Sequence, residues 1–191
     1  MIQIGAPPLR DFGDPLGVLS DCHRRVERFL GVMVQVAQQA RGGVLKSEER
    51  AALEGALRYF REAAPKHTAD EEQSLFPKLR RCEDAAVARV LLIMDGLEAD
   101  HRTVIPDHAQ VDQLGTAWLA AGRASVASTQ LLRDALSRLE RLYRRHIAIE
   151  DTEIFPTAAR VLDAASLRAV GVEMAARRGI LWPAAGGGPQ T

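Results

Sequence analysis

Two stretches of the chain repeat one pattern of residue types that bind metal ions. In each, a histidine is followed four positions later by a glutamate, then by an acidic residue, and then by an aliphatic residue and Phe-Pro. The two pairs are His67 with Glu71 and His146 with Glu150. In a helix, residues four apart lie on one face, one turn apart, so each copy aims an imidazole and a carboxylate the same way. A duplicated pair of this kind resembles half of a two-metal site.

Two more histidines lie on apolar helical stripes elsewhere in the chain. His23 interrupts the stripe of the first predicted helix, and His101 interrupts that of the third. A lone histidine on such a stripe is ordinarily a core residue, but here one falls on each of four predicted helices. Burying four imidazoles and two carboxylates without partners is costly, whereas bound metal satisfies all of them. The predicted ligands are therefore His23, His67, Glu71, His101, His146 and Glu150.

This donor set indicates the kind of centre. Imidazole and carboxylate ligands suit iron, manganese or zinc, and the absence of cysteine from the stripes argues against a thiolate site. Four imidazoles and two carboxylates can serve two ions, each with two nitrogen ligands, that share both glutamates as bridges. This count leaves coordination positions open for a bridging oxygen species and an exogenous ligand. Open positions favour chemistry or gas binding over a purely structural site.

Four long amphipathic helices are predicted to position these residues, because apolar residues recur at steps of three and four. Pro65 and Pro77 lie within the second stripe and are expected to kink it, and Pro106 and Pro156 interrupt the third and fourth. The first helix is expected to begin at Asp14-Pro15 and to end at Arg41-Gly42-Gly43, and the second is expected to begin with Ser47 as its cap. The third is expected to run from Glu83-Asp84 to Gly115, and the fourth to end near Leu162.

The predicted fold class is all-α, since no segment alternates apolar and polar residues as a strand does. Four helices with short connections pack most simply as an up-down-up-down four-helix bundle. At about 1.5 Å of rise per residue, His23 and His67 then lie at matching heights. The predicted organisation is a bundle over residues 14–162, a short C-terminal helical extension over 163–180, and a disordered tail over 181–191.

The composition argues against several classes of protein. The 191 residues fit one domain, and 25 Lys and Arg balance 25 Asp and Glu. This balance gives no reason to expect a nucleic acid or an anionic membrane as a partner. No apolar run approaches the length of a membrane span, and the first residues lack a secretory signal pattern. Cys22 and Cys82 form no C-x-x-C pair, so we expect packing or surface thiols and a reducing, cytoplasmic setting.

The order of the predicted ligands resembles the hemerythrin-like family with its HHE cation-binding motif. The resemblance covers about residues 14–162, and it rests on His23, His101 and the two His-x-x-x-Glu pairs that lead into Phe-Pro. It implies a four-helix bundle that holds two non-haem iron ions in a carboxylate- and oxo-bridged centre. It also implies terminal nitrogen ligands at His23, His67, His101 and His146, with Glu71 and Glu150 as the bridging carboxylates.

The match to the oxygen-carrying hemerythrins themselves is incomplete. Those proteins have a further histidine four residues after the histidine of the third helix, and here that position is Ile105. His108 lies on the same face about 10 Å along the axis, too far to share the ion, and is expected to be a partly buried or surface histidine. The carriers also use an aspartate at the position of Asp151, but Glu150 is preferred because it repeats the spacing of Glu71.

Three residues beside the predicted ligands have two interpretations each. Glu27 and Glu98 are expected to be solvated charges, and the alternative is a hydrogen bond to a ligating imidazole. Tyr143 lies one turn before His146. It either packs with its hydroxyl satisfied or donates a hydrogen bond to the bridging or exogenous oxygen, which makes it a candidate for acting on the centre without binding metal.

Two functions from different classes fit such a site. The first is a protein that binds or senses O2 or a related small molecule such as NO or peroxide, and the lack of an obvious motif for an organic substrate favours it. The second is a di-iron enzyme that decomposes peroxide or NO, or that repairs iron centres under nitrosative or oxidative stress. The repair proteins carry an N-terminal cysteine-bearing region, and few residues precede His23 here. That departure weakens the repair interpretation.

Two further roles receive less support from the sequence. Iron storage in the manner of ferritin needs Glu-x-x-His on two helices, and the stretch from Glu98 to His101 is the one match. A signalling role would have to act through a partner, because no output domain is evident. The sequence is compatible with a homodimer.

Overall fold

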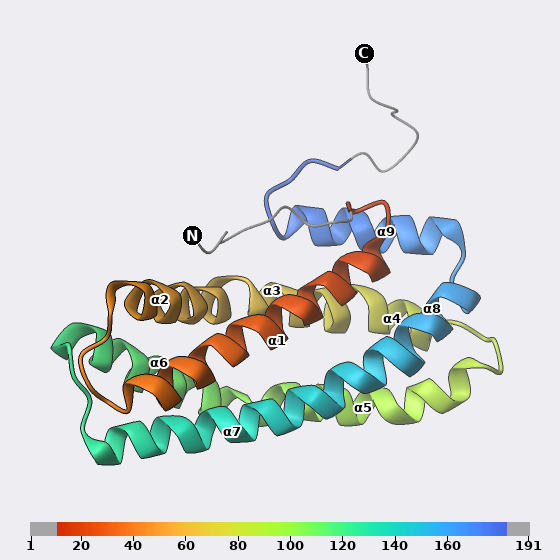
Figure 1. Cartoon of the computed structure of the whole chain (residues 1–191). Helices are drawn as coiled ribbons and strands as arrows, with labels where there is room; N and C mark the ends of the chain where they lie inside the picture. Colours follow the sequence, from red (N-terminus) through yellow and green to blue (C-terminus); the bar gives the residue numbers. More distant parts are fainter. Residues whose placement is uncertain (1–10, 183–191) are drawn as a thin grey trace. The chain divides into compact units, whose positions relative to one another are not determined.

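The structure, a computed structural model, describes residues 11–182, and all its regular elements are helical (Figure 1). No strand occurs in this part of the chain, so the all-α class is confirmed. Residues 1–10 and most of the expected tail over 181–191 lie outside the described residues. The elements are α1 (Pro15–Ala40), α2 (Ser47–Glu62), α3 (Ala64–Asp70), η1 (Glu71–Leu75), α4 (Phe76–Arg80), α5 (Val87–Thr103), α6 (Ile105–Ala121), α7 (Val126–Ile149), η2 (Glu150–Ile154), α8 (Phe155–Val161) and α9 (Ala164–Ala176).

The chain divides into two compact units. Unit 1 contains residues 1–22, 66–96 and 149–191, and unit 2 contains residues 23–65 and 97–148. Each unit is therefore assembled from segments that are distant in sequence. Among the described helices, none has an apolar stretch long enough to cross a membrane.

Unit 2 is held by one hydrophobic core to which α1, α2, α6 and α7 contribute. Leucine, methionine and tryptophan side chains spaced three or four apart meet in it, and α2 packs against α6 (Figure 1). Trp118 is buried in this core, and its indole N–H donates to the carbonyl of Gly43 at 2.9 Å. Burying one large apolar side chain stabilises a fold by about 1.5–3 kcal/mol. The apolar stripes predicted from the sequence are thus the faces that form this core.

The first helix has the predicted bounds. The carboxylate of Asp14 accepts a hydrogen bond from the backbone N–H of Gly17 at 3.0 Å, which caps α1 at its start. After Ala40 the backbone turns at Arg41 and Gly42, with φ of 48° and 79°. Glycine reaches such left-handed values without strain, and this explains why the helix stops there.

Two predicted helix starts are shifted in the structure. Ser47 is the first helical residue and not the cap; Lys46 holds the cap position, and its N–H donates to the carboxylate of Glu49 at 2.8 Å. The third helix begins at Val87 and not at Glu83-Asp84. There the Asp84 carboxylate accepts from the N–H of Ala86 at 2.7 Å, and this local bond closes a turn before the helix.

The predicted helix end at Gly115 is wrong. Gly115 lies inside α6, which continues through Trp118 to Ala121 and ends at Gly122, where φ is 71°. A Cβ atom at Gly115 would lie 2.9 Å from Cδ1 of Leu57 in α2. The glycine therefore permits close packing of α2 on α6, which local sequence could not indicate.

Unit 1 includes the expected short C-terminal helix, which is α9. The carboxylate of Asp163 accepts from the N–H of Ser166 at 2.7 Å and caps its first turn. Val170, Met174 and Ala175 are fully buried, and α9 packs against η1. This helix is therefore an integrated part of unit 1.

Candidate metal centre

Both glutamates of the repeated motif begin a π-helical turn. In η1 the N–H of Phe76 donates to the carbonyl of Glu71, and in η2 the N–H of Phe155 donates to that of Glu150. The residue after each phenylalanine is proline, which has no N–H and whose ring would clash with the carbonyl four residues earlier. A wider turn avoids that clash, and π turns are frequent at functional sites.

The kinks expected at Pro77 and Pro156 thus take the form of π turns. All four prolines stand second in a helix, where a missing N–H costs no hydrogen bond, but no π turn precedes Pro65 in α3 or Pro106 in α6. The sequence signal for the π turns is a proline six positions after each glutamate.

Unit 1 brings three of the predicted ligands together. His67, Glu71 and Glu150 each offer a ligand atom, and these atoms lie within 4.8 Å of one another. Both glutamates are 0% exposed and His67 is 7% exposed. The Nε2 atom of His67 lies 3.2 Å from a carboxylate oxygen of Glu71. The two copies of the motif therefore place their carboxylates in one buried cluster.

The chemistry of this cluster fits a cation. Two carboxylates removed from water in one place repel each other and lose their hydration, at a cost of several kcal/mol per ion. A bound divalent ion offsets both effects, and imidazole with carboxylate oxygen is the donor set of iron, manganese and zinc sites. Hard or borderline metal ions are therefore the class of ligand that these three residues suit.

Unit 2 holds the other predicted ligands. The Nε2 atoms of His101 and His146 lie 3.1 Å apart, so the two rings present their nitrogens to the same place. His146 is buried in α7, and His23 is fully buried in α1. Each of these histidines lies on the apolar side of its helix, as the stripes predict. That these three histidines and the two glutamates bind the same metal centre stays a prediction.

Asp100 is a functional candidate that sequence reasoning missed. One of its carboxylate oxygens lies 3.4 Å from Nδ1 of His146, and Arg145 donates to both oxygens at 2.7 Å. A carboxylate that accepts from the outer nitrogen of a ligating imidazole fixes its tautomer and orientation. The available signal was the position of Asp100 directly before His101 and of Arg145 directly before His146.

Tyr143 and His108 form a hydrogen-bonded pair in unit 2. The Tyr143 hydroxyl lies 2.8 Å from Nε2 of His108, and the centroid of the His108 ring lies 4.9 Å from that of Phe60, with the two rings tilted by 33°. Burial lowers the pKa of His108 from 6.5 to about 4, against the opposing effect of the nearby Asp107 carboxylate. His108 is therefore neutral at pH 7, and one of its nitrogens can accept a hydrogen bond. His108 is partly buried, which is one of the two positions expected for it, and its hydrogen-bond partner is Tyr143.

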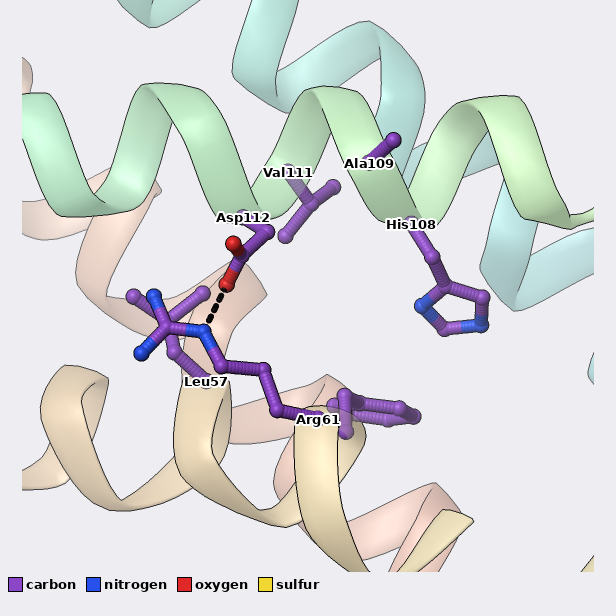
Figure 2. Close-up of a pocket in the computed structure, with 7 residues that line it drawn as sticks. Leu57, Arg61, His108, Ala109, Val111 and Asp112 are labelled. Atoms are coloured by element: carbon purple, nitrogen blue, oxygen red, sulfur yellow. Dashed lines mark hydrogen bonds and ion pairs between the residues drawn. The ribbon is translucent and has the colours of Figure 1, made fainter. Parts of the chain in front are cut away.

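His108 also lines a pocket of about 230 Å³ (Figure 2). In Figure 2 its ring lies on one side of the pocket and the ion pair between Arg61 and Asp112 on the other. Apolar atoms form most of the wall between them. The pocket therefore gives solvent a path to His108, the partner of Tyr143. The lining residues are Leu57, Phe60, Arg61, His108, Ala109, Val111 and Asp112.

The other residues that the sequence singles out beside the predicted ligands lie at or near the surface. Glu27 is exposed and pairs with Arg24 at 3.0 Å, as expected of a solvated charge, and Glu98 is half-buried. The Asp151 carboxylate accepts from the hydroxyl of Ser20 at 3.3 Å. Ile105 is 63% exposed at the start of α6. A side chain at position 105 thus faces solvent, which accounts for the lack of a ligand there.

Comparison with known proteins agrees with this chemistry. A family model described as the hemerythrin HHE cation binding domain matches residues 14–158. An uncharacterized protein of Haemophilus influenzae is 26% identical over 171 residues, which cover 87% of this chain and 91% of that protein. The family match includes both copies of the repeated motif and ends before α9.

Proposed function

The chain belongs to the hemerythrin family through its HHE cation-binding domain, and from this premise we propose that it is a non-haem di-iron protein that binds or senses O2 or a related small molecule such as NO or peroxide. The observation that carries the proposal is the buried cluster of His67, Glu71 and Glu150. Its two carboxylates can offset two of the positive charges of a pair of iron ions, and its burial keeps bulk water from the ligand atoms.

The proposed ligand set is the one expected from the sequence. His23, His67, His101 and His146 are the terminal nitrogen ligands, and Glu71 and Glu150 bridge the two ions. Iron bound in this way supplies a redox-active centre with open positions for a small ligand. The proposed scaffold is the up-down-up-down four-helix bundle over residues 14–162. A cytoplasmic location and a homodimer belong to the proposal on the grounds of the sequence alone.

Tyr143 has a defined part in this proposal. Tyr143 and His108 share one hydrogen bond, and a phenol hydroxyl can both donate and accept, so the hydroxyl can serve a small ligand as well as His108. We assign Tyr143 as the donor that acts on the exogenous ligand. Tyr143→Phe should alter the absorption spectrum or the ligand affinity of the iron-loaded protein, while an unaltered variant would reduce Tyr143 to a packing role.

The central test is anaerobic purification followed by iron reconstitution, metal analysis and absorption spectra before and after exposure to air. We expect two iron ions per chain and a reversible spectral change with O2 or NO. Glu27→Gln is the matched control, because Glu27 is an exposed helical glutamate outside the cluster. Fewer than two ions per chain with no spectral change would contradict the proposal.

The enzyme interpretation gives a different result in the same preparation. Steady turnover of peroxide or NO that is lost in His67→Ala would favour catalysis over binding or sensing. Binding without turnover would favour the proposed function.

A further inference from the structure

A buried carboxylate directly before Glu71 is bound by the end of α9. Asp70 is 0% exposed, and both of its oxygens accept hydrogen bonds from arginines that follow α9. Arg177 donates at 2.7 Å, and Arg178 donates to the two oxygens at 2.6 and 3.2 Å. We name these three residues the α9 clamp. It ties the C-terminal helix to the residue that precedes the first π turn.

The clamp also reaches into the π turn itself. The second terminal nitrogen of Arg177 donates to the hydroxyl of Ser74 at 2.6 Å, and Ser74 is a fully buried residue of η1. The turn that carries Glu71 is therefore held at its preceding residue and at its fourth residue. Two points of attachment fix the position and the rotation of a five-residue turn.

The charges of the clamp are well suited to permanent attachment. Hydrogen bonds between guanidinium and carboxylate groups are short and directional, and a buried carboxylate that loses a partner is strongly destabilising. Burial lowers the pKa of Arg178, but the hydrogen bond to Asp70, the charge of Asp70 and the interaction with Cys22 together outweigh burial and raise the pKa above its usual value. Arg178 therefore stays charged at any pH at which the protein is folded.

We propose that Arg177 and Arg178 are positioning residues for Glu71, which fix the η1 turn so that the Glu71 carboxylate is aimed into the metal-binding cluster. The inference rests on the proposed function, since it concerns the same site. It adds to that function a part of the chain beyond the family match, which ends at residue 158. The arginines act through Asp70 and Ser74 and do not touch the metal.

The test uses the full chain and a double variant, Arg177→Lys with Arg178→Lys. Lysine keeps the charge but cannot make the forked contacts. We expect amide hydrogen exchange in η1 of the metal-free protein to speed up by about tenfold or more, while exchange in η2 stays the same. We also expect cobalt(II) affinity to fall by roughly tenfold to 100-fold, with a changed cobalt absorption spectrum.

Two further variants separate positioning from general stability. Arg168→Lys makes the same exchange at an exposed arginine of α9 outside the clamp, so it should change neither readout. Ser74→Ala removes the bond from Arg177 and a hydrogen bond of Ser74 with Glu173, and it leaves Asp70 paired with both arginines, so it tests the clamp where the double variant fails to fold. It should speed exchange in η1 by a smaller factor.

Two outcomes would overturn the proposal. One is unchanged η1 exchange in both the lysine and the alanine variants. The other is faster exchange with the cobalt spectrum and affinity unchanged within twofold, which would leave the arginines a purely structural role. Wild-type protein that binds no metal would defeat the proposed function instead, and the exchange in metal-free protein would still report on the clamp.

Discussion

The turns η1 and η2 have the same five-residue length, the same carbonyl acceptor on a buried glutamate and the same Phe-Pro after them. Their supports differ. The first is held from α9 by the clamp on the fully buried Asp70 and Ser74. Contacts of the second include the hydroxyl of Ser20 on Asp151 and Arg89 on Glu153, and Arg89 is 77% exposed. One copy is thus attached through a fully buried carboxylate, whereas these two contacts of the other lie nearer to solvent.

The histidine ends of the two copies differ as well. His67 lies against the glutamate of its own copy, at 3.2 Å. His146 lies against His101 and Asp100, and near it the Tyr143 and His108 pair connects with an open pocket. The duplicated motif thus repeats the residue types and the backbone turn, whereas the surroundings of its two copies differ. The glutamate turn of the first copy is held from α9, and the histidine of the second copy lies near a hydrogen-bonded pair of which His108 lines a pocket.

The largest expected effect follows the loss of either glutamate charge. Glu71→Gln and Glu150→Gln should each weaken iron or cobalt binding by about 100-fold or more, because a ligand is lost as well as its charge. In the metal-free protein both should raise the melting temperature, since each removes one of two buried carboxylates. Metal analysis after dialysis and thermal unfolding measure the two effects. A glutamate whose loss leaves the metal content unchanged is not a ligand. The two copies of the motif would then differ in metal binding.

Acid should destabilise the protein through the buried imidazole of His108, near the second copy of the motif. The pKa of His108 is about 4 when folded and 6.5 ordinarily, so the unfolded chain takes up a proton first as the pH falls. The stability that depends on neutral His108 is complete above pH 6.5 and is lost towards pH 4, by up to about 3 kcal/mol. Urea unfolding of metal-free protein at pH 7 and pH 4.5 should show this loss in the wild type and not in His108→Gln.

Tyr143→Phe is the matched control for this pH effect. It removes the hydroxyl and leaves the imidazole buried, so the loss of stability in acid should persist. An equal acid sensitivity of wild type and His108→Gln would show that other groups govern it.

Replacing the proline after each π turn tests whether the α9 clamp helps to hold η1. Pro77→Ala and Pro156→Ala restore an N–H and permit an ordinary helical turn, which would rotate the glutamate away from the cluster. We expect Pro156→Ala to lower cobalt affinity by about tenfold and Pro77→Ala to lower it less, because the α9 clamp holds η1. Pro106→Ala, in a helix without a π turn, should have no effect on the metal. Equal losses in the two copies would show that the clamp adds nothing to η1.

The smallest expected effect concerns the contacts of η2. Ser20→Ala and Arg89→Ala should each cost less than about 1 kcal/mol in the free energy of unfolding, because one bond is long and the other is an exposed ion pair. Metal affinity should change by less than about twofold by the same reasoning. Denaturant unfolding and cobalt titration measure both. A loss of metal comparable to that of the Arg177 and Arg178 variant would remove the difference between the copies.

Much of this protein follows from its sequence because the signals are local. Apolar residues at steps of three and four predict the helices, and Asp14 and Gly42 mark the bounds of α1 as the structure has them. The histidine and glutamate spacing predicts which side chains share a helical face. The helix starts predicted at Ser47 and Glu83 are wrong, because caps and turns depend on one or two hydrogen bonds that several neighbouring residues can make. The helix end predicted at Gly115 is wrong because this glycine serves the packing of α2 on α6.

The family was also within reach of the sequence, since it depends on residue types at fixed separations. The candidate residues that the sequence missed all act across large separations. Asp70 is paired with Arg177 and Arg178 more than a hundred positions away, and Asp100 approaches His146. No periodicity connects such residues, because only the packed helices bring them together.

The sequence by itself determined the all-α class, the metal-binding chemistry and the duplicated His-x-x-x-Glu motif, because helical periodicity and ligand type are properties of the residues in order. Tertiary structure decided that the two glutamates share one buried cluster, that Gly115 lets α2 pack on α6, and that α9 is fastened beside Glu71. Burial and electrostatic pairing depend on which segments meet in space, and that is settled only when the chain folds.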